Sequence, residues 1–253
     1  MRLYVTGRLC VEWGDAAIHE DDLPGPQTVL LFGMLGINAG QITSRDEIAD
    51  ALWPRGLPKT WESNIRAVVA RLRATLRGLD DSVASAVVAQ GHGYRLALGD
   101  GDWVDFHEAI GSLHRAEAAL LSGKPQAAAA SAWVAEAIAR RDLLPSVEGT
   151  WLETHRRRLE TVRLRALDCL AGALCEVGEN ADAVRHADLA LSLDPFRESS
   201  HRRLIEVYGR SEDRGSAARA FHACETLLVG ELGVAPSPST RAAYERAVGL
   251  ALD

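Results

Sequence analysis

The stretch from Lys59 to Arg77 constrains the fold more than any other part of the sequence. Its apolar residues recur at the spacing of one helix face. They are Ile65, Val68, Val69, Leu72 and Leu76. Five Lys or Arg side chains against one acid give the stretch a formal charge of +4, although the whole chain carries −7. The pattern predicts an amphipathic helix with a cationic outer face.

Small alanines between the arginines of this helix would let it approach another surface closely. We interpret that surface as the major groove of DNA, which admits a helix and presents distinguishable base edges. The alternative is a solvated helix with ordinary surface arginines, because charged helix faces are common. The neighbouring segments favour the first interpretation.

The segments before this helix predict a small sheet and two further helices. Residues 3–13 alternate between apolar and polar side chains, which indicates a half-buried strand, and residues 16–18 indicate a short return strand. Residues 27–38 predict a helix, in which Gly33 and Gly36 would allow another element to pack closely.

A second helix is expected between that one and the cationic stretch. Ser44 and Glu47 have the spacing of a capping box at its start, and Trp53, which precedes a proline, marks its end. Thr60 then suits the N-cap of the cationic helix.

Residues 83–98 predict a β-hairpin with its turn at residues 90–93. Two helices joined by a short loop form a helix-turn-helix, and a hairpin after them is a wing. Residues 1–98 are therefore expected to form an α+β winged helix-turn-helix domain.

Residues 99–103, with two glycines and two aspartates, are the expected linker, and residues 104–253 are expected to form an all-α, tetratricopeptide-like domain. Ala183 and Ala187 recur 34 residues later as Ala217 and Phe221, and this is the period of tetratricopeptide repeats. The alternative is a generic helical bundle. Glycines and prolines separate seven expected helices, at residues 104–122, 125–141, 149–177, 181–193, 196–210, 214–230 and 238–251.

The length and composition of the chain limit the classes of protein to which it can belong. The chain has 253 residues, enough for two domains, and 25% of them are charged, as in globular proteins. It has no apolar run long enough to span a membrane and no signal-peptide core, so a cytoplasmic protein without a membrane partner is expected. Its four cysteines form no CxxC pair and its histidines are scattered, so neither a metal nor another cofactor is expected. No catalytic arrangement is apparent, and an enzyme is not expected.

Four short segments resemble those of a known family. They are residues 46–53 (DEIADALW), residues 69–73 (VARLR), Gly93-Tyr94, and residues 228–237 (LVGELGVAPS). Residues 1–98 resemble the winged-helix DNA-binding domain of response-regulator effectors, and residues 104–252 resemble the bacterial transcriptional activator domain. Together they resemble a short member of the Streptomyces antibiotic regulatory protein family.

The resemblance implies sequence-specific binding to double-stranded promoter DNA. Two protomers, a homodimer at least on DNA, would occupy direct repeats and help the RNA polymerase holoenzyme engage there, often at secondary-metabolite gene clusters. Such a protein would be associated with the nucleoid.

The resemblance also implies which side chains meet the DNA. The groove-facing positions are Asn64, Ala67, Ala70 and Arg71. An arginine forks to guanine and an asparagine pairs with adenine, so two of these positions are suited to reading bases. The positions suited to phosphates are Lys59, Arg66 and Arg73. Gln90 and His92 occupy the wing tip, where the family usually has an arginine.

Two other functions stay open. Residues 1–100 hold ten Lys or Arg against twelve acids, a charge of −2, which is low for a protein that neutralises phosphates. The main alternative is therefore a protein-interaction adaptor with a degenerate winged helix and a partner-binding helical domain. A third hypothesis adds a small-molecule effector site inside the helical domain, lined by Trp133 and Trp151.

A second basic cluster lies at residues 156–158, followed by Arg163 and Arg165. Glu153 and Glu160 are interleaved with it, so the simplest interpretation is a solvated helix face. The alternative is a contact with DNA or with an acidic partner.

Overall fold

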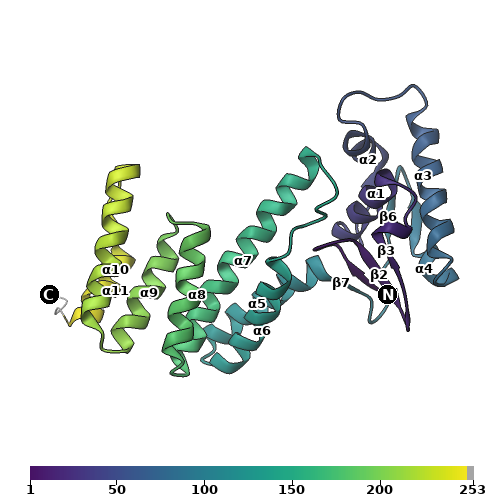
Figure 1. Cartoon of the computed structure of the whole chain (residues 1–253). Helices are drawn as coiled ribbons and strands as arrows, with labels where there is room; N and C mark the ends of the chain where they lie inside the picture. The colour runs from purple at the N-terminus through teal and green to yellow at the C-terminus, as the bar shows by residue number, and fades with distance from the viewer. Residues whose placement is uncertain (250–253) are drawn as a thin grey trace. The chain divides into compact units, whose positions relative to one another are not determined.

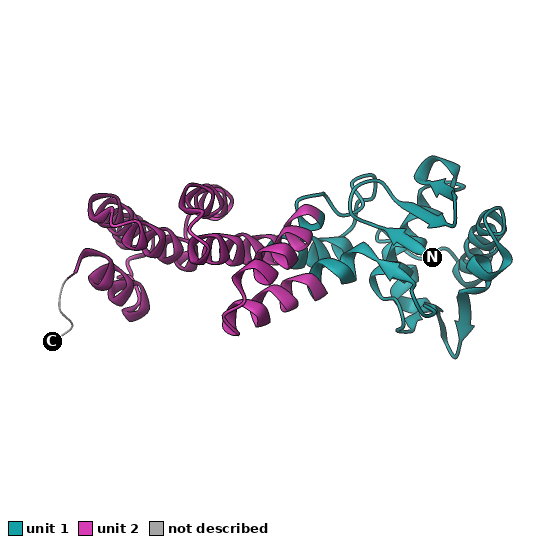
Figure 2. Ribbon diagram, turned by 90° about the horizontal axis from the view of Figure 1, so that it is seen from below, with its two compact units in different colours: residues 1–110, 138–160 teal, residues 111–137, 161–253 magenta. Residues whose placement is uncertain are grey.

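The computed structural model describes residues 1–249 (Figure 1). The ends of the expected helix at 238–251 and of the expected domain at 104–253 lie outside the described residues. The chain divides into two compact units (Figure 2). Unit 1 contains residues 1–110 and 138–160, and unit 2 contains residues 111–137 and those from 161 onward. The expected domain boundaries at 98 and 104 stay a prediction.

The first sheet of unit 1 shows that the single strand predicted over residues 3–13 is wrong. This segment forms two antiparallel strands, β1 (Arg2–Tyr4) and β2 (Cys10–Trp13), and the chain turns between them at Gly7, whose φ is +81°. Leu3 pairs with Val11 and both are buried, so the apolar alternation continues through the turn and hides it. The predicted return strand is confirmed as β3 (Ala16–His19).

Two segments far along the chain complete the edge of this sheet. Strand β7 (Trp103–Val104) pairs in parallel with β1, in the order β3-β2-β1-β7. Thr6 forms an isolated antiparallel bridge with Leu143, and the Leu144 amide donates to the Val5 carbonyl at 3.0 Å. The expected linker therefore ends inside a strand, and a loop from beyond residue 138 packs on β1.

Four helices lie between β3 and β7 along the chain, namely α1 (Pro26–Ile37), α2 (Arg45–Leu52), α3 (Trp61–Leu76) and the short α4 (Asp81–Ser85), with a 3-10 turn, η1 (Glu20–Asp22), before them. The first three were predicted and are confirmed. The two glycines of α1 pack closely, as expected. A Cβ at Gly33 would lie 2.4 Å from Leu144 Cδ1, and one at Gly36 would lie 2.5 Å from Leu3 Cδ2.

The two predicted helix caps have different outcomes. The capping box is confirmed, because Ser44 Oγ accepts from the Glu47 amide at 3.1 Å and the Glu47 carboxylate accepts from the Ser44 amide at 2.8 Å. The Thr60 cap is wrong. Its ψ of 24° is not the extended conformation that aims an N-cap hydroxyl at the first amides. Instead, Ser63 Oγ donates to the Thr60 carbonyl at 2.8 Å.

The second sheet contains the predicted hairpin, but the hairpin is shorter than expected. Its strands are β5 (Val87–Gln90) and β6 (Gly93–Leu96), joined to β4 (Thr43–Ser44) in the order β4-β6-β5. The predicted start at residue 83 is wrong because residues 81–85 form α4. The Asp80 carboxylate begins α4 by accepting from the Ser82 amide at 2.8 Å.

The seven helices predicted after residue 103 are confirmed. They are α5 (Asp105–Leu121), α6 (Pro125–Ala139), α7 (Thr150–Glu176), α8 (Asn180–Leu193), α9 (Glu198–Arg210), α10 (Arg214–Leu227) and α11 (Pro238–Val248). A π-helical turn, η2 (Leu228–Leu232), follows α10. None of the helices within residues 1–249 has both the length and the apolar character that crossing a bilayer requires.

Helices α8 to α11 of unit 2 pack side by side in the tetratricopeptide-like manner expected from the 34-residue repeat. Ala187 of α8 and its counterpart Phe221 of α10 are buried in one cluster with Ile205 of α9 and Ala243 of α11. The repeated positions are therefore core positions, which explains why they are small or aromatic.

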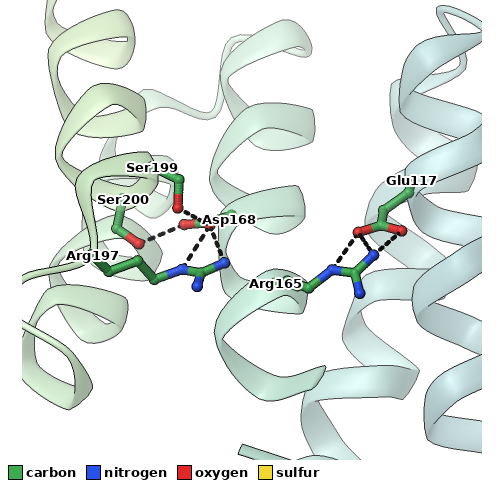
Figure 3. Close-up of polar contacts among 6 residues, drawn as sticks. All are labelled: Glu117, Arg165, Asp168, Arg197, Ser199 and Ser200. Carbon is green, nitrogen blue, oxygen red and sulfur yellow. Dashed lines mark hydrogen bonds and ion pairs between the residues drawn. The ribbon is translucent and has the colours of Figure 1, made fainter. Parts of the chain in front are cut away.

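Polar contacts fix neighbouring helices of unit 2 on α7 (Figure 3). Asp168 accepts from Ser200 Oγ at 2.6 Å, from Ser199 Oγ at 2.9 Å and from Arg197 Nη2 at 3.0 Å, which holds the start of α9. Arg165 forms a two-pronged ion pair with Glu117 of α5, at 2.8 and 2.6 Å. Bidentate pairs of this kind add geometric specificity to the packing.

Candidate nucleic-acid interface

Helix α3 has the two faces that its sequence predicts. All five of its predicted apolar residues are buried: Ile65, Val68, Val69, Leu72 and Leu76. This burial anchors one side of the helix against α1, α2 and α4 and turns the opposite side outward. The orientation of every other side chain on α3 follows from it.

The predicted groove-facing residues lie together on the outer side. Ala67, Ala70 and Arg71 are exposed and Asn64 is half-buried. Asn64 and Arg71 are seven residues apart, about two helical turns, so they lie along one line of the helix. Within residues 1–249, the Arg71 guanidinium has no ion-pair or hydrogen-bond partner. Its five donors are available to a ligand.

The three side chains expected to contact phosphates are not equivalent. Lys59 is exposed in the loop before α3. Arg66 is exposed and lies 3.8 Å from Glu62, a contact of little energy at this exposure. Arg73 is half-buried, and its Nε and Nη2 both donate to the Val87 carbonyl, at 3.0 and 2.6 Å. Arg73 therefore joins α3 to the hairpin.

The wing tip is exposed at both predicted residues. Gln90 and His92 flank Gly91, whose φ of +55° suits a tight hairpin turn. The His92 carbonyl accepts from the Arg45 amide at 3.1 Å, so the tip is held against the start of α2. Because Arg73 holds the other side, the wing has a defined position relative to α2 and α3.

Gly93 is the residue on which this placement depends. A Cβ there would lie 2.2 Å from the Thr43 carbonyl oxygen in the neighbouring strand, closer than any real contact. We expect Gly93→Ala to lower the free energy of unfolding by about 1–3 kcal/mol, because the backbone of β4 must move. Thermal unfolding of the two proteins measures the effect. Gly99→Ala, whose Cβ would meet only Asp102 at 3.6 Å, is the matched control. Equal stability of Gly93→Ala and the unchanged protein would contradict the expectation.

Sequence reasoning missed one residue of the outer face. Ser63 is exposed and continues the line of Ala67, Ala70 and Ala74 along α3. The sequence could have identified Ser63, because these four positions recur at helical spacing between the arginines. The side chains along the centre of the outer face are therefore small over its whole length.

Two arginines of the second basic cluster contact groups of their own unit. The Arg156 guanidinium donates to the carbonyls of Leu143, Leu144 and Val147, at 3.2, 3.1 and 2.9 Å, and fixes the loop before α7. The Arg158 guanidinium lies over the Phe106 ring at 5.8 Å. Arg156 therefore has a structural role, and the alternative of a contact with DNA or an acidic partner stays a prediction.

The two tryptophans proposed for an effector site lie in different units. In unit 2, Trp133 packs edge-on against His186, with ring centroids 4.8 Å apart. In unit 1, Trp151 packs against His155 at 4.7 Å. Each ring therefore has a packing role within its own unit, and an effector lined by both stays a hypothesis.

Residues 104–247 match the family model described as the bacterial transcriptional activator domain, which covers more than half of the chain. The transcriptional regulatory protein MoaR1 of Mycobacterium tuberculosis is 26% identical over 231 residues, which are 87% of this chain and 71% of MoaR1. The regulatory protein AfsR of Streptomyces griseus is 28% identical over 225 residues, 87% of this chain and 22% of AfsR. The chain belongs to the Streptomyces antibiotic regulatory protein family. It is a transcriptional regulator of this type.

A solved structure supports the fold of this family member. Mycobacterium tuberculosis EmbR in complex with a low affinity phosphopeptide has a TM-score of 0.86 and is 23% identical. The similarity covers 100% of this chain and 66% of that chain, so the EmbR chain is the longer of the two. A winged helix followed by a helical domain is thus the architecture of this Streptomyces antibiotic regulatory protein.

Proposed function

We propose that this protein is a sequence-specific DNA-binding transcriptional activator and that α3 enters the major groove. The observation that supports this most is the outer face of α3, where Arg71 and Asn64 share one line beside small alanines. An arginine forks to guanine O6 and N7, and an asparagine pairs with adenine N6 and N7. Ala67 and Ala70 leave room for the groove floor and can touch a thymine methyl group.

Lys59 and Arg66 supply the phosphate contacts in this proposal. Both are exposed at the start of α3, so they border the base-reading face. Such contacts set the register of a protein on DNA and contribute affinity without reading sequence. Arg73 has its Nε and one terminal nitrogen bound to Val87, and it contributes mainly by placing the wing. In this proposal, Gln90 and His92 contact the DNA backbone beside the groove. They do so without the positive charge that an arginine would supply.

We also propose that two protomers bind direct repeats in a promoter and help RNA polymerase engage there, at genes of a secondary-metabolite cluster. Family membership supports the regulatory role. The charge of −2 over residues 1–100 supports the need for a second protomer, because one winged helix neutralises few phosphates. Action at promoters would place the protein on the nucleoid.

A gel-shift titration of the full chain with the DNA upstream of its own gene tests the proposal. A specific complex is expected, and the logarithm of the binding constant should fall with the logarithm of salt concentration by about 0.9 per phosphate contacted. Unrelated DNA of equal length is the control. Equal affinity for both would reject sequence-specific binding.

A protein-interaction adaptor is the second candidate function. The acidic balance of residues 1–100 and the engagement of Arg73 with the hairpin favour it. An adaptor would bind both the upstream DNA and the unrelated DNA only at the nonspecific level. It would keep its protein partner after Arg71 is replaced. Pull-down of partners by the unchanged protein and by Arg71→Ala, run beside the gel shift, separates the two functions.

A further inference from the structure

Unit 2 contains a groove that the proposed DNA contacts do not use. It has a volume of about 420 Å³ and lies between α7, α9 and α11. This volume is in the range of sites that bind ligands. Five charged side chains line it, namely Glu176, Arg203, Glu206, Arg210 and Arg246.

Small residues shape the walls of the groove. A Cβ at Gly209 of α9 would lie 2.7 Å from the Ala247 Cβ of α11, so the two helices approach as closely as a glycine permits. A Cβ at Gly172 of α7 would lie 3.5 Å from Arg203 Cζ, which places the Arg203 guanidinium over the surface of α7. The arginine thus reaches across the groove from α9.

The groove has an excess of positive charge. Arg203 pairs with Glu206 at 2.8 Å, and Arg210 pairs with Glu176. Arg246 is exposed on the last turn of α11, and no ion-pair or hydrogen-bond partner is found for its guanidinium among residues 1–249. The groove therefore has three guanidinium groups and two carboxylates. A ligand with negative charge would neutralise the excess positive charge.

We propose that this groove binds an acidic, extended segment of a partner protein. Arg203 and Arg210 are seven residues apart on α9, which separates them by about 10 Å along the helix. An extended segment in the polyproline II conformation advances about 9 Å in three residues and returns to the same face, so acidic side chains at that spacing reach both arginines. Arg203 and Arg210 each use one terminal nitrogen in their ion pairs, so their other N–H groups can donate to a carboxylate of the segment, and Arg246 supplies a cation that no groove carboxylate pairs with. A compact anion does not span this distance.

The test uses the full chain and a fluorescein-labelled peptide of glycine, alanine and three glutamates placed three residues apart. Fluorescence anisotropy is expected to show saturable binding, at least tenfold weaker for the same peptide with glutamines. Arg246→Ala is expected to weaken binding at least fivefold, and Arg246→Glu to abolish it. Arg241→Ala, an exposed arginine on the same helix that does not line the groove, is the matched control and should change binding less than twofold.

Three results would overturn the inference. The first is equal binding of the glutamine peptide, and the second is equal loss in Arg246→Ala and Arg241→Ala. The third is displacement of the labelled peptide by free glutarate at the same concentration as by unlabelled peptide, which would indicate a small-molecule site. Thermal unfolding checks that each variant is folded. Gel shifts of Arg246→Ala with the upstream DNA should match the unchanged protein, so this inference and the proposed DNA binding can fail separately.

Discussion

Replacing Arg71 with alanine is expected to weaken binding to the protein's own upstream DNA by about 10- to 100-fold, the effect of losing one two-pronged base contact. Binding to unrelated DNA should change by less than about threefold, because base contacts add little to nonspecific affinity. The reason is geometric. Arg71 is exposed on α3 and has no partner within residues 1–249, so its guanidinium is free to fork to a guanine. Gel shifts on both DNAs, at one salt concentration, measure the difference.

Two variants separate base reading from charge. Arg71→Lys keeps the positive charge but loses the planar fork, so it should lose most of the specificity and keep the nonspecific affinity. Arg77→Ala removes the same charge from the residue that follows α3. Arg77 Nε lies 3.8 Å from Asp81 Oδ1, and this change should reduce specific binding by less than about threefold. A similar loss in Arg71→Ala and Arg77→Ala, with Arg71→Lys unchanged, would show that α3 is a charged patch that does not read bases.

Replacing Asp105 with alanine is expected to lower the free energy of unfolding of unit 1 by about 3–5 kcal/mol, a large part of the stability of a typical domain. Asp105 is fully buried at the start of α5. Its carboxylate accepts from the Val5 amide at 2.9 Å, from the Thr6 amide at 3.0 Å and from Thr6 Oγ1 at 2.6 Å. The change leaves these buried donors unsatisfied, at about 1–3 kcal/mol each. Urea denaturation followed by circular dichroism measures the loss.

Thr6→Val is the matched control for Asp105. It removes one donor, keeps the shape of the side chain and leaves both backbone bonds, so it should cost about 1 kcal/mol. If Thr6→Val and Asp105→Ala have equal effects, the backbone amides do not depend on the carboxylate, and the expectation fails.

Burial raises the pKa of Asp105, and the hydrogen bonds from Thr6 and Val5 oppose the increase. An acid whose pKa is higher in the folded state binds more protons there than in the unfolded state. Its contribution to stability therefore decreases as pH rises from its ordinary pKa of 3.8 towards the raised value. The difference in stability between the unchanged protein and Asp105→Ala should accordingly be largest at the acidic end of that window.

Local patterns were enough to predict most of the helices. The apolar spacing in α3, the Ser44 capping box and the seven helices after residue 103 depend on residues within a few turns of one another, and all are confirmed. The same holds for the close packing at Gly33, although the identity of its neighbour, Leu144, was not predictable.

The predictions that failed depend on geometry or on distant partners. The strand over residues 3–13 hides a turn because apolar alternation continues on both sides of Gly7. The hydroxyl of Thr60 has suitable chemistry for a cap, but its backbone angles aim it elsewhere. Strand β7 exists only because β1, about a hundred residues earlier, offers a free edge.

By itself, the sequence determined that α3 is amphipathic and cationic on its outer side and that Asn64 and Arg71 share a line on it, because helical periodicity is a local property. Only the tertiary structure decided that Arg73 fastens the hairpin, that Asp105 binds the amides of β1, and that arginines of α9 and α11 meet over one groove. These contacts join residues that are separated along the chain, and what a charged side chain does depends on which donors and acceptors folding brings within hydrogen-bond distance.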